Sequence, residues 1–481
     1  LALVVYVATL APSITFENNG TDSGDLITAA RTLGVPHPPG YPTYTLLAWL
    51  ATNLPVGTIA YRVNLLSALS GALAVGLVCR CAQMLLPAGR NSLLLSAAAA
   101  LTLAFSPLLW SQAVIAEVYA LHTLLAALFL WLLLRWRNGG ADANLWSAGL
   151  VLGAGLGNHL TLVFAAPAAL VLLWPQRRRW LRAGAMLPSL LLFLLGLGVY
   201  AYLPWAARHN PPVNWGNPQT WQGFRWLVTA QQYQAFVFGL PTGQIPERLA
   251  TWAGRFGAQF VWVGVVMVLA GALWWWRRDR WFLLASLAWS LPLTVYAFFY
   301  DTGDSHVYLL PVLILLNLWW SGGALYLLDL VSSRTRRQVW QQAALVLILL
   351  LPFASLGLHW QEVDLSDDWV AYAYASQMLD GVEPHSLIVV RGDRPTFALW
   401  YAVYAEGQRP DVALVSGPML AFIWYRAHVR QLYPNLIVEE PYATDEVTTD
   451  DLVHDLIAAN QGQAPIYATD PKESWEAWFD F

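Results

Sequence analysis

Charged residues and cysteines are scarce in this chain of 481 residues. Only 12% of the residues are charged and 57% are hydrophobic, whereas about a quarter of the residues in an ordinary soluble domain are charged. Cys79 and Cys81 are the two cysteines, and their position at the end of an apolar run suggests neither a disulfide framework nor a zinc site. A net charge of -4, without a basic tract outside short loops, argues against nucleic acid as a partner. The composition predicts a protein that lipid surrounds over most of its length.

Apolar segments and tryptophan are abundant instead. Many of the 27 tryptophans stand at the ends of apolar runs, where an amphipathic ring suits the membrane–water interface. Crossing a bilayer takes roughly 20 apolar residues. We expect an α-helical polytopic membrane protein with about eleven transmembrane helices, near residues 1–12, 63–86, 92–110, 115–134, 144–157, 159–174, 184–204, 256–276, 281–299, 307–328 and 339–358. Residues 144–174 could instead form one long helix.

The placement of arginine orients these segments. With a cytoplasmic N-terminus, arginines gather in the inside loops near 80–90, 135–137, 177–182, 277–280 and 334–337, as the positive-inside rule requires. This favours two helices in 144–174. It puts the loops 13–60, 158–159, 205–255 and 300–306 outside, together with the tail. We expect an integral membrane protein of a bacterial inner (cell) membrane.

The tail has a different composition and predicts a second domain. Acidic residues crowd 362–368 and 439–451, and short β-type runs at 387–390 and 412–415 alternate with helical patterns at 369–379 and 396–406. We therefore divide the chain into a transmembrane domain, 1–358, and an extracytoplasmic α/β domain, 359–481.

The first outside loop carries two carboxylates, Asp22 and Asp25, directly after a membrane segment. They could serve as a general base and its orienting partner, because proton transfer needs a positioned group of suitable pKa. They are also spaced as the N-cap and N3 residues of the following helix, a capping box. The spacing alone leaves both interpretations open, and two carboxylates without a third evident ligand do not specify a divalent metal.

Other polar side chains lie close to the membrane, where ionisable groups are costly and face a cavity or a partner. These are Arg62, Glu117, His122, His159, Asp301, Asp304 and His306. The loop 205–255 carries Arg208, Arg225, Arg248 and Arg255, against the positive-inside trend. A guanidinium suits a phosphate, although a solvated charge or a headgroup anchor is the alternative for each. Trp215, Trp221 and Tyr233 could stack on a sugar or anchor the loop in the interface.

The order of motifs resembles the GT-C glycosyltransferase superfamily. The run from His37 to Ala82 begins with a His-Pro-Pro turn and continues into an Arg–x–x–Ser/Asn–Ala–Leu pattern. More narrowly, the chain is similar to a protein O-mannosyltransferase-like family with eukaryotic endoplasmic-reticulum and bacterial members. The motifs that carry this similarity are Asp22–Asp25, Gly34–Pro42, Ala116–Tyr119, Gly157–His159, Asn210–Pro218, Asp367–Asp368 and Gly407–Val412.

The resemblance implies transfer of a sugar, mannose by expectation, from a polyprenyl-phosphate donor to an acceptor hydroxyl, possibly Ser or Thr of a protein, with inversion. It implies a catalytic Asp22 with Asp25 as helper. Contacts to the donor phosphate or sugar are expected from Arg208, Arg225, Arg255, His37, Arg62, Glu117, His159 and His306. The lipid-linked donor, which could be polyprenyl or dolichyl phosphate mannose, takes the place of a cofactor. A membrane transporter and a receptor with an extracytoplasmic ligand-binding domain are the rival classes.

Overall fold

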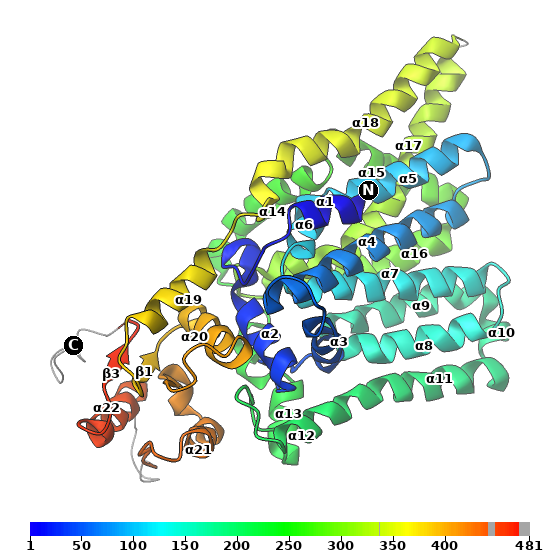
Figure 1. The fold of residues 1–481 in the computed structure, drawn as a ribbon. Helices are drawn as coiled ribbons and strands as arrows, with labels where there is room; N and C mark the ends of the chain where they lie inside the picture. The colour runs from blue at the N-terminus through cyan, green and yellow to red at the C-terminus, as the bar shows by residue number, and fades with distance from the viewer. Residues whose placement is uncertain (336, 441–447, 471–481) are drawn as a thin grey trace.

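The computed structural model describes residues 1–335, 337–440 and 448–470 (Figure 1). Each of the eleven expected apolar segments falls on a helix or a helical pair. Seven helices are long and apolar enough to span a membrane, or nine spans if each of two bent pairs counts as one. The seven are Ile59–Leu85 (α4), Val118–Arg137 (α7), Leu160–Trp180, Ala183–Ala207, Arg280–Phe299 (α16), Ser305–Arg334 and Gln338–Val363 (α18).

Four expected segments differ from simple spans, so a count of seven to nine replaces the expected eleven. The helices α1 (Ala2–Ala8) and α8 (Ala143–Leu156) have 7 and 14 residues, fewer than the roughly 20 that crossing a bilayer takes. Two segments are bent: Arg90–Ala104 (α5) meets Pro107–Ala113 (α6) at 64°, and Thr242–Gln259 meets Val263–Arg278 (α15) at 89°.

The two bends touch each other. The side-chain oxygen of Gln259, at the end of α14 (Ile245–Gln259), accepts a hydrogen bond from the backbone N–H of Leu108 at 3.1 Å, in the first turn of α6. A side chain at the second break thus satisfies a backbone N–H group at the first. The structure also decides between one helix and two in residues 144–174. Helix α8 ends at Leu156 and the next helical turn begins at Leu160, so the alternative of a single long helix is wrong.

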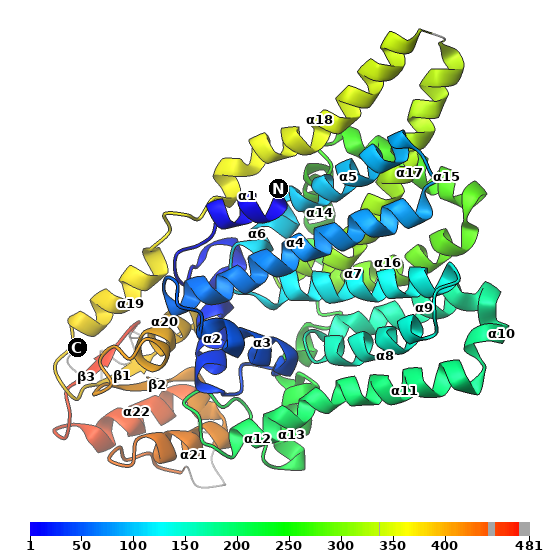
Figure 2. The same cartoon turned by 45° about the vertical axis from the view of Figure 1, so that its right-hand side comes forward.

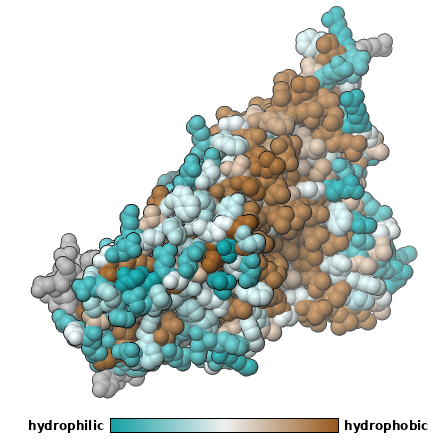
Figure 3. Space-filling view, viewed as in Figure 1, coloured by the Kyte–Doolittle hydropathy of each residue, from teal (hydrophilic) through white to brown (hydrophobic). Residues whose placement is uncertain are grey.

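The surface agrees with a membrane-embedded bundle. In Figure 3 a hydrophobic band crosses the helical part and gives way to a hydrophilic surface over the C-terminal region. The tip where α17 (Leu310–Arg334) is followed by α18, at the far end of the bundle, is hydrophilic again. Arg336 of the expected inside cluster and residues 441–447 of the expected acidic segment lie outside the described residues.

The C-terminal region is a small α/β unit, as expected. Its sheet has the order β2–β1–β3 and is parallel throughout, with Leu387 opposite Ala413 on one side and Ile466 on the other. Parallel neighbours need crossover connections, and the helices supply them. The elements are α19 (Val370–Asp380), β1 (Leu387–Val390), α20 (Asp393–Trp400), β2 (Ala413–Ser416), α21 (Ile423–Leu432), α22 (Thr449–Asn460) and β3 (Ile466–Ala468).

This region packs directly on the first loop, without a free linker. Figures 1 and 2 both place α20 beside α2 (Ser23–Thr32). The approach is close enough that a Cβ added to Gly24 of α2 would lie 2.3 Å from the Phe397 carbonyl oxygen of α20. At the start of α4 the side chains of Glu406 and Tyr401 accept hydrogen bonds from the first two backbone N–H groups, each at 3.2 Å. The helix α18 runs to Val363, past the expected boundary at 358, and the division into two domains stays a prediction.

Candidate functional site

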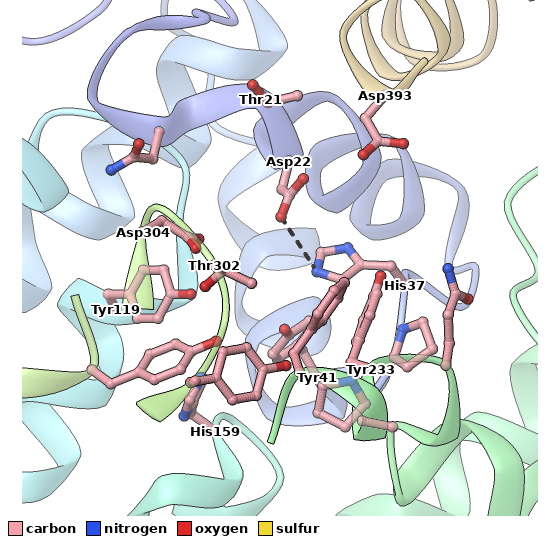
Figure 4. A pocket seen from close by; sticks show the side chains of 18 of the residues that line it. Thr21, Asp22, His37, Tyr41, Tyr119, His159, Tyr233, Thr302, Asp304 and Asp393 are labelled. Carbon is pink, nitrogen blue, oxygen red and sulfur yellow. Dashed lines mark ion pairs between the residues drawn. The ribbon is translucent and has the colours of Figure 1, made fainter. Parts of the chain in front are cut away.

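Asp22 occupies the N-cap position of α2, but its side chain does not cap the helix. No hydrogen bond joins the carboxylate to the backbone N–H groups of the first turn. Its Oδ2 instead lies 3.6 Å from Nε2 of His37 (Figure 4). The capping-box alternative is therefore wrong, and the carboxylate is available for contacts outside its own helix.

Asp25 is fully buried one helical turn later and holds His37 in place. Its carboxylate accepts hydrogen bonds from the backbone N–H of His37 at 3.0 Å and from the Nε1–H of Trp215 at 2.9 Å. The Nδ1 atom of His37 lies 2.7 Å from the same carboxylate. An ionised carboxylate only accepts, so Nδ1 carries a proton and donates it to this bond. The opposite ring nitrogen, Nε2, then faces Asp22.

A short bridge between distant segments brings Trp215 to this site. The backbone N–H of Val35 donates to the Val213 carbonyl at 2.8 Å, and the N–H of Trp215 donates to the Val35 carbonyl at 3.0 Å. The chain passes so close here that a Cβ on Gly34 would lie 2.4 Å from the Val213 oxygen. The conformation of the 210–218 motif thus depends on the segment that precedes His37.

Asp22 and His37 line a cavity of about 700 Å³. This volume lies within the range of sites that enclose a small-molecule ligand, roughly 300–1,000 Å³. The cavity walls come from the first loop, the start of α7, the turn after α8, the 230–236 segment, the 296–308 segment and α20. Segments far apart in the sequence therefore meet around one carboxylate.

The chemistry of the walls suits a sugar. Tyrosines gather below Asp22 in Figure 4, and Asp304 with Thr302 lies on the opposite side of Asp22 from Asp393. Carboxylates and hydroxyls accept or donate hydrogen bonds to sugar hydroxyls, and aromatic faces offer flat apolar surface. The lining tyrosines are Tyr41, Tyr119, Tyr233, Tyr296, Tyr300 and Tyr308.

The protein environment raises the pKa of both Asp22 and His37, to different values. Desolvation by the surrounding protein raises the pKa of Asp22 to about 6, although the nearby His37 offsets part of this rise. Water reaches 43% of the Asp22 side chain through the cavity, so the carboxylate stays accessible within protein walls. Burial opposes the charge on His37, but Asp22 and the hydrogen bond to Asp25 outweigh it and raise the pKa of His37 to about 9. At neutral pH the site therefore holds an imidazolium between two carboxylates.

His159 also lines the cavity, as a wall residue rather than beside Asp22. Its Nδ1 lies 2.7 Å from the Thr161 hydroxyl, and its ring lies 5.2 Å from that of Tyr308 between centroids. Of the expected site residues, the cavity thus brings together Asp22, His37 and His159, with Asp25 directly behind His37.

The other expected residues are not among the described residues that line the cavity. Arg62 donates to the backbone carbonyls of Thr52, Val56 and Gly57, which fixes the turn between two helices. Glu117 is buried at the start of α7. The remaining four are Arg208, Arg225 and Arg255, which are exposed, and His306, which is half-buried.

Sequence reasoning did not select Asp393 and Arg394, although both line the cavity. They belong to the C-terminal region, and no local pattern ties them to a loop more than 350 residues earlier. Asp304 was noted as an ionisable group near the membrane but was not selected. Among the described residues, no group of three or more His, Cys, Asp or Glu side chains is placed to hold a metal ion.

Comparison with known proteins identifies relatives of both parts of the chain. Residues 22–182 match the family model of the protein O-mannosyl-transferase TMEM260 N-terminal domain, and residues 371–435 match that of the TMEM260-associated domain 2. The protein O-mannosyl-transferase TMEM260 of Mus musculus is 29% identical over an alignment of 454 positions that covers 87% of this chain. The protein of the same name from Dictyostelium discoideum is 23% identical over an alignment of 521 positions, gaps included, that covers 96% of this chain. The chain spans 62% of the length of each of these relatives.

The fold has solved counterparts. A structure of ArnT from Cupriavidus metallidurans bound to undecaprenyl phosphate superposes with a TM-score of 0.60 at 12% identity, covering 86% of this chain and 88% of that one. The apo structure of the same protein gives a TM-score of 0.58. The helical bundle with its small α/β region is thus an ArnT-like fold, which confirms the expected fold class of a helical polytopic membrane protein with a small C-terminal α/β region. In sequence, the chain is similar to the TMEM260 protein O-mannosyl-transferase family over residues 22–182 and 371–435, and this is the family that its motifs resemble.

Proposed function

We propose that the protein transfers a sugar, mannose by analogy with its relatives, from a polyprenyl-phosphate donor to a Ser or Thr hydroxyl of a protein acceptor. The observation that carries this proposal is the Asp22 carboxylate, uncapped and directed into a cavity of about 700 Å³ toward His37. The relatives are named as O-mannosyl-transferases, and the ArnT structure of similar fold contains undecaprenyl phosphate. Both facts support the reaction class and the donor class.

In the proposed reaction Asp22 is the general base. Its carboxylate takes the proton of the acceptor hydroxyl while the acceptor oxygen attacks the anomeric carbon of the donor. The bond between that carbon and the phosphate oxygen breaks, and the electron pair leaves with the polyprenyl phosphate. Attack from the face opposite the phosphate inverts the anomeric configuration.

His37 is the group that we assign to the leaving phosphate. The imidazolium faces the cavity through Nε2, and Asp25 fixes the ring from behind. A positioned cation near the breaking bond stabilises the charge that grows on the leaving oxygen. Asp25 therefore acts as a positioning residue rather than a second base, since its oxygens are occupied by His37 and Trp215.

A transfer assay tests the proposal. Purified protein in lipid vesicles is given polyprenyl-phosphate mannose with a radioactive sugar and an array of Ser- and Thr-containing peptides. We expect label in peptide with the wild-type protein and a loss of roughly 10²–10⁴-fold in rate with Asp22→Asn. The variant should still fold, because the side chain does not cap α2, and should unfold at a slightly lower temperature because it loses the ion pair with His37.

Asp301→Asn is the matched control. Asp301 lies in the 300–306 loop but is not among the described residues that line the cavity, so this variant should retain wild-type transfer. Full activity in Asp22→Asn would show that Asp22 is not the general base. Solute uptake into the vesicles without any transfer would favour the transporter class instead.

A further inference from the structure

The cavity has two unlike walls. On one side it is lined by Tyr296 at the end of α16 and by Tyr300 and Tyr308 just beyond, all next to membrane-spanning helices. On the other side it is lined by Asp393, Arg394 and Phe397 of α20, which belongs to the C-terminal α/β region. In Figure 4 Asp393 lies across Asp22 from Asp304, so the two walls face each other over the proposed base.

The donor is bound to the membrane and the acceptor is soluble in water, so each substrate is expected at a different wall of the cavity. A polyprenyl chain stays in the hydrocarbon of the bilayer because its apolar surface is costly to expose to water. The donor must therefore reach the cavity past the wall formed by the membrane helices. A water-soluble acceptor has no such constraint, and Asp393 and Arg394 on the wall formed by α20 are exposed.

Arg394 has the properties of a binding group rather than a structural one. Its guanidinium lies 5.5 Å from the centre of the Phe16 ring, and Phe16 itself lines the cavity. In the described part of the chain, neither Arg394 nor Asp393 forms an ion pair, although both are exposed to the cavity. The Phe16 ring contacts the guanidinium face, and this leaves its N–H donors and the neighbouring carboxylate without an ion pair in the described part of the chain.

We propose that Asp393 and Arg394 form the acceptor subsite, where they bind the backbone of an extended protein segment beside the Ser or Thr that is modified. A peptide backbone presents a carbonyl acceptor and an N–H donor at each residue. Arg394 donates to the carbonyl and Asp393 accepts from the N–H, which directs the hydroxyl of that segment toward Asp22. Phe16 holds the guanidinium plane in position by a cation–π contact. The inference rests on the proposed function, because it assigns one of that reaction's two substrates to a wall of the same cavity.

Separate titration of the two substrates tests the subsite. The probes are polyprenyl-phosphate mannose and the peptide of the array that the wild-type protein modifies best. For Arg394→Ala we expect the KM for the peptide to rise roughly tenfold or more, since a hydrogen bond to a charged group contributes about that factor. The KM for the lipid donor should stay unchanged. Asp393→Asn should raise the peptide KM in the same way, and Arg394→Lys should recover part of the affinity because it keeps the charge without the fork.

Arg391→Ala is the matched control. Arg391 precedes α20 by two residues and is not among the described residues that line the cavity, so both KM values should remain at the wild-type level. A thermal unfolding curve of Arg394→Ala that matches the wild type shows that loss of the Phe16 contact has not undocked the region.

Two results overturn the inference while the proposed function survives. One is a rise in the donor KM of Arg394→Ala with an unchanged peptide KM, which would assign the guanidinium to the donor phosphate. The other is wild-type kinetics in both Arg394→Ala and Asp393→Asn. Absence of any transfer by the wild-type protein would overturn the proposed function, and this inference with it.

Discussion

His37 lies between two carboxylates that differ in environment. Asp25 is fully buried and saturated with hydrogen-bond donors, whereas Asp22 is open to the cavity. The imidazole ring therefore connects the buried, rigid Asp25 to the accessible Asp22. A site held in this way needs no large rearrangement when a substrate enters, which is the condition for electrostatic preorganisation.

The first prediction at this scale concerns pH. A base must be ionised, so kcat/KM should rise as Asp22 loses its proton near its pKa of about 6. It should fall again as His37 loses its proton near its pKa of about 9, because the cation beside the leaving phosphate disappears. We expect a bell-shaped profile of kcat/KM measured from acid to alkaline pH.

Asp25→Asn supplies the control for this assignment. The hydrogen bond to Asp25 and its charge are among the causes that raise the pKa of His37, so the alkaline limb should move to lower pH in this variant. The charge on Asp25 also raises the pKa of Asp22, so the acid limb should move to lower pH as well. A rate that keeps rising through pH 9 in the wild-type protein would contradict the role of the imidazolium.

The second prediction compares two candidates for the donor phosphate. Arg208 ends α12 (Tyr202–Ala207) and is exposed outside the cavity, whereas His37 lines it. We expect His37→Gln to lower kcat/KM for the lipid donor by at least about tenfold, because it removes a charge from the reacting centre. Arg208→Ala should change it by less than about twofold, as an exposed charge is screened by solvent. A larger loss in Arg208→Ala than in His37→Gln would return the phosphate role to the arginine.

Sequence reasoning could find the carboxylates and named His37 and Trp215 separately, but it did not predict the contacts that join them. Asp22 and Asp25 stand out because they follow an apolar segment, a feature that one window of sequence contains. The contact of Asp25 with Trp215 spans 190 residues and depends on the bridge between Val35 and Asn214. No periodicity encodes such a contact. The same reason explains why Asp393 and Arg394 were missed.

Among the elements, α2 is the piece on which both parts of the molecule depend. It carries Asp25 and begins at Asp22, and it lies against α20 through Gly24. A glycine here is required by close approach of two backbones, not by an unusual backbone angle. Any side chain at this position must push α20 away from the cavity that it lines.

Gly24→Ala should therefore lower both stability and activity. The added Cβ would lie 2.3 Å from a backbone oxygen, a clash that side-chain motion cannot relieve, and overpacking of this kind costs about 1–3 kcal/mol or more. Thermal unfolding and the transfer rate measure the two effects. Gly76→Ala is the control, since nothing lies within 4 Å of its added Cβ and α4 is helical there. Equal behaviour of the two variants would show that α2 and α20 do not pack so closely.

Element prediction succeeded where composition and length decide the outcome. The apolar segments are helical because buried or lipid-exposed backbone must satisfy its own hydrogen bonds, and β1 is recognisable as a short run of four buried residues, Leu387–Val390. The bends after Ala104 and after Gln259 were not expected. A hydrogen bond between Gln259 and Leu108, two residues that no local pattern connects, joins the two breaks.

At the scale of the whole molecule, the arrangement of the helices predicts the membrane orientation of the chain. The α17–α18 tip and the C-terminal region lie at opposite ends of the bundle in Figure 1, and α18 is apolar enough to span a membrane between them. With the arginine-rich loops inside, the C-terminal region is expected on the non-cytoplasmic side.

Cysteine labelling in intact cells checks this topology. In a background without Cys79 and Cys81, Ser366→Cys should react with a membrane-impermeant thiol reagent, since Ser366 is exposed just after α18. Ser333→Cys, exposed near the end of α17 (Leu310–Arg334), should react only after permeabilisation. The reversed pattern would invert the membrane orientation and contradict an extracytoplasmic acceptor.

The packing of α2 on α20 also limits how related proteins can be recombined. A chimera joined just after Val363 would place a foreign α20 against this chain's Gly24 and a foreign Tyr401 position against the start of α4. The contacting surfaces of α2 and α20 would then come from different proteins, although their backbones lie in direct contact. A chimera that takes both 13–60 and the segment from 364 onward from one parent keeps the original pair of surfaces together. Acceptor preference should therefore be inherited through these two stretches as one unit, even though more than 300 residues of sequence separate them.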